Sequence, residues 1–249
     1  MLKKYLDIHP EIQRSIYFGY PVVVLESDII STSIPYPQNI EISNNICKII
    51  RMNGAIPATT AVINGILKIG LTEEEFELLL MNRISLSANV TDLPFVISKQ
   101  LTCPTTLTAT ITIAKLLGLN IISTSRIDGF SEESSNHLQV SSHIQSICSE
   151  DIIIVCNDIN TNTDIDITLN HLKSNNVITL EYGKKQSSTS RSINSTNEIV
   201  NLIKIKSDLN LKNGVLILDQ NSKSIIDKIY SSANLASKIA TNFSLTLKK

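Results

Sequence analysis

The segment VVVLESDIISTSIPYPQN at residues 22–39 decides the fold that we expect for this chain. It opens with a continuous apolar run, whose length and β-branched content are typical of a buried parallel strand. Glu26 follows directly at the end of that run. Ligands bind outside the carboxyl ends of strands in open α/β sheets. Glu26 is therefore either a functional carboxylate or a solvated residue in an ordinary loop, and its position alone leaves both alternatives open.

Strand and helix signals alternate outward from this segment. Short apolar runs predict strands at residues 57–63, 92–98, 120–124, 151–156, 177–180 and 215–218. Helical spacing and capping signals predict helices within residues 1–19 and at residues 39–52, 72–81, 104–118, 140–147, 164–175 and 224–241. Residues 186–195 are rich in Ser and Thr and predict a loop. This alternation predicts an α/β fold, a single three-layer α/β/α domain over residues 1–249 with a largely parallel central sheet.

The composition and charge of the chain weigh against several classes of function. The chain has 249 residues, of which 42% are hydrophobic and 18% charged, as in a folded globular protein. Its net charge of −1 and pI near 6.4 give no electrostatic footprint for nucleic acid or an anionic membrane. No apolar segment approaches the roughly 18 residues that span a bilayer. The N-terminus carries no leader pattern, so we expect a cytoplasmic protein. The scattered cysteines fall mostly in apolar patterns and predict buried free thiols.

Glycine is scarce in this chain. Average usage of about 7% predicts roughly 17 glycines in this length, whereas the chain has 8. Proteins that hold phosphate on backbone amides use glycine so that the backbone can approach the ligand. The deficit therefore weighs against an unaltered phosphate site.

Three spaced motifs carry a resemblance to a known family. Leu25-Glu26-Ser27 with the PYPQN run at residues 35–39, the GAIPAT run at residues 54–59 and the DLPFV run at residues 92–96 occur in family order. They resemble the signature of the pseudouridine-5′-phosphate glycosidases. The chain is similar to that family along most of its length, as a divergent and shortened member. The resemblance implies the family fold and a small-molecule nucleotide substrate.

The resemblance also implies a reaction. Family members reversibly cleave the C–C bond between uracil and ribose 5-phosphate. A lysine amine captures the opened sugar as a Schiff base, a glutamate transfers protons, and a divalent metal, typically Mn²⁺, orders the site. Glu26 falls on the proton-transferring glutamate, and burial would raise the pKa of such a carboxyl towards neutrality.

The nucleophilic lysine is replaced in this chain. The family pattern Val-Cys-Ala-Gly-Ala-Lys corresponds to residues 155–160, which places Asn160 at the position of that lysine. An amide cannot form an imine, because a Schiff base needs a primary amine. Lys184 and Lys185 follow a predicted strand and could supply a substitute amine, although a solvated surface pair is the alternative that we favour.

Other family site positions are also substituted. The second family lysine corresponds to Ser87, and the metal-binding aspartate corresponds to Gln139. A Gln carbonyl is a weak neutral ligand for a hard divalent ion, so tight Mn²⁺ binding is not expected. The family's Ser-Ala-Asp becomes Ser141, Ser142 and His143, which we take as substrate-binding positions. We expect His137 and His143 to be surface or interface histidines rather than metal ligands.

The glycine-rich turn and the C-terminal region differ from the family as well. Thr-Gly-Gly-Ile-Gly-Gly becomes residues 124–129, TSRIDG, so side chains project where bare backbone lies in the family. The family's Asn-Asn pair falls on Ser231 and Ser232, and a family segment is missing between about 218 and 225. The resemblance also implies a homotrimer.

One substrate-binding element persists in the sequence. Thr105 and Thr106 stand at a predicted helix start, where hydroxyls and backbone N–H groups can bind phosphate. We take Thr106 and Leu107 as substrate-binding positions. Simple helix capping is the alternative, and we favour it.

Two hypotheses follow from these substitutions. In the first, the chain is an active glycosidase that uses Glu26 and a relocated amine. In the second, which we prefer, it is a non-catalytic family member that acts as a ligand-binding remnant or as a partner subunit. Retained fold motifs beside replaced catalytic positions favour the second hypothesis.

Overall fold

The computed structural model describes most of the chain as two compact units. It describes residues 4–81, 86–132, 138–160, 165–183, 191–219 and 224–247. Contacts within the chain divide it into a first unit, Met1–Asn120, and a second unit, Ile121–Lys249. That the two units make up one domain over residues 1–249 stays a prediction.

The first unit contains a mixed sheet in the order β1–β4–β3–β2. Its strands are β1 (Leu6–Ile8), β2 (Val22–Leu25), β3 (Ile56–Ile63), β4 (Ile66–Ile69) and β5 (Cys103–Pro104). β2 and β3 are parallel, β1 and β4 are parallel, and β3 pairs antiparallel with both β4 and β5. Asn64 and Gly65 both have positive φ between β3 and β4, as the two-residue turns of hairpins require.

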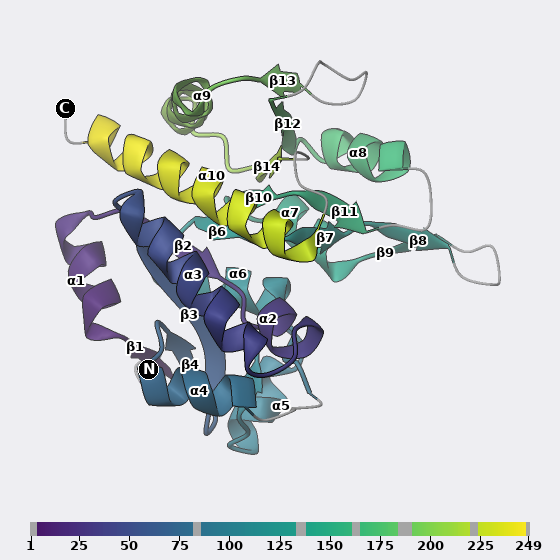
Figure 1. Ribbon diagram of the computed structural model, residues 1–249. Helices are drawn as coiled ribbons and strands as arrows, with labels where there is room; N and C mark the ends of the chain where they lie inside the picture. The colour runs from purple at the N-terminus through teal and green to yellow at the C-terminus, as the bar shows by residue number, and fades with distance from the viewer. Residues whose placement is uncertain are drawn as a thin grey trace. The chain divides into compact units, whose positions relative to one another are not determined.

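Helices flank the strands of the first unit (Figure 1). They are α1 (Pro10–Phe18), α2 (Asp28–Ser33), α3 (Gln38–Met52), α4 (Glu73–Met81), α5 (Leu93–Ser98) and α6 (Leu107–Lys115). α3 packs on β3 through buried Ile42, Ile46 and Ile50, which share one helix face at a spacing of four residues. α6 packs on β2, β3 and β4.

The second unit contains a parallel sheet in the order β6–β10–β14–β12–β13. These strands are β6 (Ile121–Ser123), β10 (Ile153–Cys156), β12 (Ile178–Tyr182), β13 (Arg191–Ile193) and β14 (Val215–Leu218). Every residue of β6, β10 and β14 is buried. Strands covered on both faces carry continuous apolar runs, which is why the IIVC and VLIL sequences form the centre of this sheet.

Two small ribbons and the helices complete the second unit. β7 (Arg126–Asp128) pairs parallel with β11 (Asp158–Asn160), and β8 (Phe130–Glu132) pairs antiparallel with β9 (Leu138–Val140). The helices are α7 (Ser142–Ser149), α8 (Ile165–Ser174), α9 (Thr196–Asp208) and α10 (Ile225–Leu247). α10 packs on β6 and β10 and lies in front of them in Figure 1.

The predicted α/β fold with a largely parallel sheet flanked by helices is confirmed. The expected helices and strands are present except at residues 92–98, where the prediction of a strand was wrong. These residues form α5, with Pro94 in its first turn, where proline is tolerated. Phe95 is 56% exposed, so the run is not buried on both sides. A short apolar run does not distinguish a strand from a helix by periodicity.

The structure also contains elements that the sequence analysis did not predict. α2 occupies the expected turn after Glu26. β13 lies at Arg191–Ile193, so the prediction of a loop over residues 186–195 was wrong for these three residues. α9 follows β13, in a segment for which the sequence patterns predicted no element. The Ser195 hydroxyl accepts a hydrogen bond from the Glu198 N–H at 3.2 Å, and the Glu198 carboxylate accepts one from the Asn194 N–H at 3.1 Å. This pattern resembles a capping box, a signal that could have predicted α9.

Two further expectations concern membranes and thiols. Within the described residues, no helix is long and apolar enough to cross a membrane. The four cysteines are free thiols, as expected, and Cys103 and Cys156 are buried. Cys47 and Cys148 are partly exposed, so the prediction of burial was wrong for these two.

Candidate functional site

Glu26 lies at the carboxyl end of β2, as the strand pattern predicts. The residue is only 6% exposed, so the alternative of a solvated loop carboxylate is wrong. Ser27 and Asp28 follow it into α2. A buried carboxylate at a strand end is placed where α/β proteins bind ligands.

A network of buried hydroxyls holds the chain that follows Glu26. The Ser27 hydroxyl accepts a hydrogen bond from the Thr105 N–H at 2.9 Å. The Thr105 hydroxyl donates to the Thr60 carbonyl at 2.9 Å and lies 2.8 Å from the Thr60 hydroxyl. The Thr60 and Thr110 hydroxyls are also 2.8 Å apart. This threonine network, which we define as Ser27, Thr60, Thr105 and Thr110, fixes the end of β2 against β3 and α6.

Ser87 and Asp28 extend this part of the first unit. The Ser87 hydroxyl donates a hydrogen bond to the Asp28 carboxylate, and the Asp28 N–H donates to the Thr105 carbonyl at 3.2 Å. Ala88 forms an isolated bridge with Thr105. The structure therefore brings Ser87, the position of the family's second lysine, to the same hydrogen-bonded cluster as the residues after Glu26.

Thr106 and Leu107 lie where α6 begins. Thr106 is the N-cap residue, with extended backbone, but its side chain makes no cap hydrogen bond within the part of the chain described. The favoured expectation of capping by this hydroxyl is therefore wrong. Leu107 is fully buried.

In the second unit, Asp128 joins three of the predicted site residues. Its backbone N–H donates to His143 Nδ1 at 3.0 Å, and its carbonyl accepts from the Ser141 hydroxyl. Its carboxylate Oδ1 accepts from Asn160 Nδ2 at 2.9 Å. Ser142, the first residue of α7, is exposed. Ser141, His143 and Asn160 thus gather around an aspartate that the sequence analysis did not single out.

The contact between Asp128 and His143 is not an ion pair. Asp128 Oδ2 lies 3.6 Å from His143 Nδ1, but Nδ1 already accepts the Asp128 backbone N–H. A ring nitrogen that accepts a hydrogen bond carries no proton. The His143 side chain is 16% exposed, because its ring helps to hold β7 against α7. It is therefore not a fully solvated surface histidine, and a place at an interface stays a prediction.

Gln139 lies on β9, opposite Ser131 of β8. Its side chain can offer a metal only a neutral amide oxygen. Among the residues described, no group of three or more His, Cys, Asp or Glu side chains could hold a metal ion. The donor set at this position therefore does not fit a tightly bound Mn²⁺ ion, which prefers carboxylates.

Buried polar atoms lie at the ends of β6 and β10. Ser125 and Asn157 are each 2% exposed, and the Asn157 N–H donates to the Ser125 carbonyl at 3.2 Å. Ser125 Oγ and Asn157 Oδ1 have no hydrogen-bond partner among the residues that the structure describes. Nearby, the Asn157 amide donates to the Asp219 carbonyl, and the Ser231 hydroxyl donates to the Asp219 carboxylate. Such unsatisfied buried groups cost stability.

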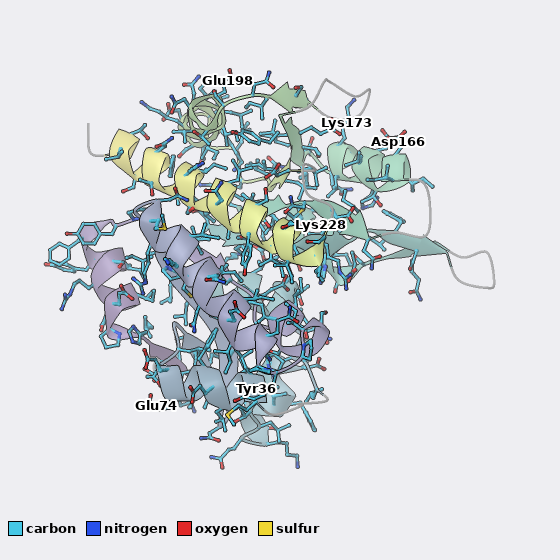
Figure 2. All side chains as sticks on the ribbon, in the orientation of Figure 1. Tyr36, Glu74, Asp166, Lys173, Glu198 and Lys228 are labelled. Atoms are coloured by element: carbon cyan, nitrogen blue, oxygen red, sulfur yellow. The ribbon has the colours of Figure 1, made fainter. Side chains whose placement is uncertain are left out.

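A lysine of α10 reaches β11. Lys228 Nζ donates to Asp158 Oδ2 at 2.7 Å, with the lysine side chain 24% exposed and the aspartate 46% exposed. Figure 2 labels Lys228 near the first turn of α10. Asp158 and Asn160 are the two outer residues of the three-residue strand β11, on either side of buried Ile159. A primary amine is therefore held beside the strand that contains Asn160.

Cys103 is excluded as an alternative nucleophile. It lies on β5, two residues before Thr105, and is fully buried. Burial raises the pKa of its thiol to about 11. The thiol is therefore protonated at neutral pH, and thiolate chemistry requires the deprotonated form.

Some predicted residues lie outside the described part of the chain. These are Lys184, Lys185 and His137. Asp28, Asp128, Asp158 and Lys228 are the site residues that the sequence analysis missed. Their partners are distant in sequence, but Asp28 and Asp158 each stand just after a predicted strand, which is the signal that could have selected them.

The structure is that of an α/β protein with clusters of polar side chains at the ends of its strands. The family model for indigoidine synthase A like proteins matches residues 11–241. A pseudouridine-5′-phosphate glycosidase of Alkaliphilus metalliredigens is 34% identical over 226 residues, which cover 87% of this chain and 74% of that protein. One of Clostridium botulinum is 34% identical over 228 residues, with the same shares. The chain belongs to this family of indigoidine synthase A like proteins and pseudouridine-5′-phosphate glycosidases.

Solved structures share the fold. The prealnumycin C-glycosynthase AlnA, solved in complex with ribulose 5-phosphate, matches 98% of this chain and 99% of its own with a TM-score of 0.84 and 17% identity. An indigoidine synthase A-like protein from Thermotoga maritima matches 98% of this chain and 97% of its own with a TM-score of 0.75 and 17% identity.

Proposed function

We propose that the chain binds pseudouridine 5′-phosphate and its product ribose 5-phosphate, and that it cleaves the C–C glycosidic bond far more slowly than active family members do. The observation that carries this proposal is Asn160. Its amide stands at the position of the family's nucleophilic lysine and donates to Asp128 Oδ1 at 2.9 Å. An amide nitrogen cannot replace the amine of a Schiff base.

Retention of the ligand is supported in the first unit. Glu26 is buried at the carboxyl end of β2, and the threonine network holds the chain beside it. The start of α6, which the Thr106 side chain leaves uncapped, offers backbone N–H groups to a phosphate. The curated relatives are named as glycosidases of a nucleoside phosphate, and AlnA was solved with a sugar phosphate.

The proposal includes weak metal binding. Gln139 replaces the carboxylate that would hold Mn²⁺ in the family, and a neutral amide oxygen is a poorer ligand for a hard divalent ion. We expect calorimetric titration with Mn²⁺ to show weaker binding than in an active relative. Gln139→Asp is expected to strengthen that binding.

Restoring the family residues tests the proposal. The triple variant Ser87→Lys, Gln139→Asp, Asn160→Lys is expected to release uracil from pseudouridine 5′-phosphate faster than the wild type, with Mn²⁺ present. Asn170→Lys, which changes an exposed amide on α8, is the matched control and is expected to leave the rate unchanged. No gain in the triple variant, although it folds and binds the substrate, would contradict the proposal.

A second candidate is a non-catalytic partner subunit or ligand-binding remnant. The observation that favours it is that substituted positions are engaged within the protein: Ser87 donates to Asp28, and Asn160 donates to Asp128. A homotrimer and a cytoplasmic location accompany both candidates as proposals. Sedimentation of the purified chain, alone and mixed with an active relative, distinguishes self-assembly from mixed assembly.

A further inference from the structure

Two lysines of the second unit differ in how their amines are used. Lys206 has a side chain only 7% exposed, and its Nζ donates to Asp151 at 2.5 Å and to the Leu211 carbonyl at 2.8 Å. It holds the end of α9 in place. Lys228 has a side chain 24% exposed, and its Nζ donates to Asp158 Oδ2 at 2.7 Å. Lys228 is therefore the more accessible amine.

The strand β11 places that amine beside Asn160. Residues i and i+2 of a strand point to the same face, and the burial pattern of β11 shows Ile159 buried between two less buried neighbours. Asp158 and Asn160 therefore share a face, with their Cα atoms about 7 Å apart at strand spacing. The Nζ that Asp158 holds lies on the face where the family lysine would project.

We propose that Lys228 supplies the amine that Asn160 lacks, and that its Nζ forms an imine with the open-chain aldehyde of ribose 5-phosphate. This inference rests on the proposed binding of the sugar phosphate. It places a relocated nucleophile on α10 rather than on β11.

The chemistry balances without an oxidant or a reductant. Asp158, whose Oδ2 accepts from Nζ, takes the proton that leaves the ammonium group. The nitrogen lone pair forms a bond to C1 of the sugar, and the carbonyl π electrons move to oxygen, which takes up a proton. Loss of that hydroxyl group as water, with the remaining proton of the nitrogen, gives the C=N bond. Hydrolysis reverses each step.

Borohydride trapping tests the inference on the full chain. The protein is incubated with ribose 5-phosphate and reduced with borohydride, whose hydride converts an imine into a stable secondary amine, and the modified lysines are located by peptide mass spectrometry. The adduct is expected on Lys228 in the wild type. Lys238 is the internal control for nonspecific modification, because it is an exposed lysine on the same helix.

Lys228→Arg separates an imine-forming amine from a structural ion pair. The arginine keeps a positive charge opposite Asp158 but cannot form an imine, so the adduct is expected to disappear while the thermal unfolding midpoint stays near that of the wild type. Lys238→Arg is expected to leave the Lys228 adduct unchanged.

Binding of ribose 5-phosphate, measured by calorimetry, separates failure of the Lys228 inference from failure of the proposed function. Binding by the wild type with no more adduct on Lys228 than on Lys238 would overturn the inference and leave the proposed function standing. An adduct on Lys184 or Lys185 instead would also overturn it. Absence of binding, together with absence of an adduct, would overturn the proposed function and the inference with it.

Discussion

The two units differ in whether the buried polar groups at their strand ends have hydrogen-bond partners. In the first unit, each hydroxyl of the threonine network has a hydrogen-bond partner, from Ser27 to Thr110. In the second unit, Ser125 Oγ and Asn157 Oδ1 have none among the described residues. Satisfied buried networks specify a structure, whereas unsatisfied groups cost stability. The strand end that carries Glu26 in the first unit is therefore fixed by a satisfied network, whereas the strand ends of the second unit carry unsatisfied polar atoms among the described residues.

The resemblance to the family supports the same contrast. Ser125 stands where the family has a glycine, and Asn157 stands where it has an alanine. The motifs that revealed the family have structural roles in the first unit. Asn39 of the PYPQN run is buried and donates to the Leu80 carbonyl at 3.0 Å, which joins α3 to α4. Asp92 of the DLP run accepts from the Asn89 N–H at 3.1 Å. Motifs that hold the fold are thus retained.

The largest effect on stability is expected at the glycine that remains in the altered turn. A Cβ at Gly129 would lie 2.6 Å from Thr168 Oγ1 and 2.8 Å from Ile159 Cγ2, and both neighbours are buried. Gly129→Ala should destabilise the protein by about 3 kcal/mol through overpacking, measured by urea unfolding. A loss below about 1 kcal/mol would show that this turn is not tightly packed.

The second-largest effect on stability is expected in the threonine network. Thr105→Val keeps the side-chain shape but removes the hydroxyl that donates to the Thr60 carbonyl. It should cost about 2 kcal/mol, because buried partners lose their hydrogen bonds. Thr106→Val, which changes a partly exposed neighbour, is the control in the same unfolding experiment. Equal stabilities of the two variants would mean that the buried Thr105 hydroxyl contributes no more than the partly exposed Thr106 hydroxyl, and would contradict the difference drawn between the units.

A change in stability of the opposite sign is expected where the second unit has buried polar atoms without partners among the described residues. Ser125→Ala removes a buried hydroxyl that lacks a partner among the described residues, so it should leave stability unchanged or raise it by up to about 1 kcal/mol. The measurement is again urea unfolding. A clear destabilisation would mean that this hydroxyl makes a hydrogen bond in solution, and the contrast between the units would weaken.

The smallest effect on stability is expected from the solvent-exposed ion pair between Arg51 and Glu11 in the first unit. Arg51 donates to Glu11 at 2.5 and 2.7 Å, and this hydrogen bond lowers the pKa of the Glu11 carboxyl below its ordinary value of 4.5. Its contribution to stability is therefore present above about pH 4.5 and is lost as the pH falls through the lowered pKa. Both side chains are over a third exposed, so Glu11→Gln should cost less than about 1 kcal/mol at pH 7.

The pH dependence of that variant provides the check. The difference in unfolding free energy between wild type and Glu11→Gln should shrink as the pH is lowered below 4.5. A difference that stays constant with pH would mean that the glutamate carboxylate is not stabilised by Arg51.

Much of the fold could be predicted from local patterns. The VLIL and IIVC runs are long enough and apolar enough to specify buried strands, and the Thr72–Glu75 capping box forms as predicted, with hydrogen bonds of 3.1 and 3.2 Å. Residues 92–98 were misassigned because a short apolar run carries no decisive period. α9 was missed because its capping signal follows a Ser/Thr-rich segment.

The site could be predicted only in part. Glu26 was found because a strand end marks it. Asp128 and Lys228 were not found, because their roles depend on partners that folding brings from distant parts of the sequence. Lys228 and Asp158 are 70 residues apart in the chain, and the register of β7 and β11 places Asp128 opposite Asn160. No local pattern encodes such pairs.

Steady-state uracil release from pseudouridine 5′-phosphate tests the central claim most directly. The wild-type chain and the Alkaliphilus metalliredigens relative would be compared at equal concentrations with Mn²⁺ present. We expect the wild type to bind the substrate but to release uracil at least about 100-fold more slowly, because we propose that Asn160 and Gln139 stand at the positions of the family lysine and the metal carboxylate. Release at the rate of the relative would contradict it.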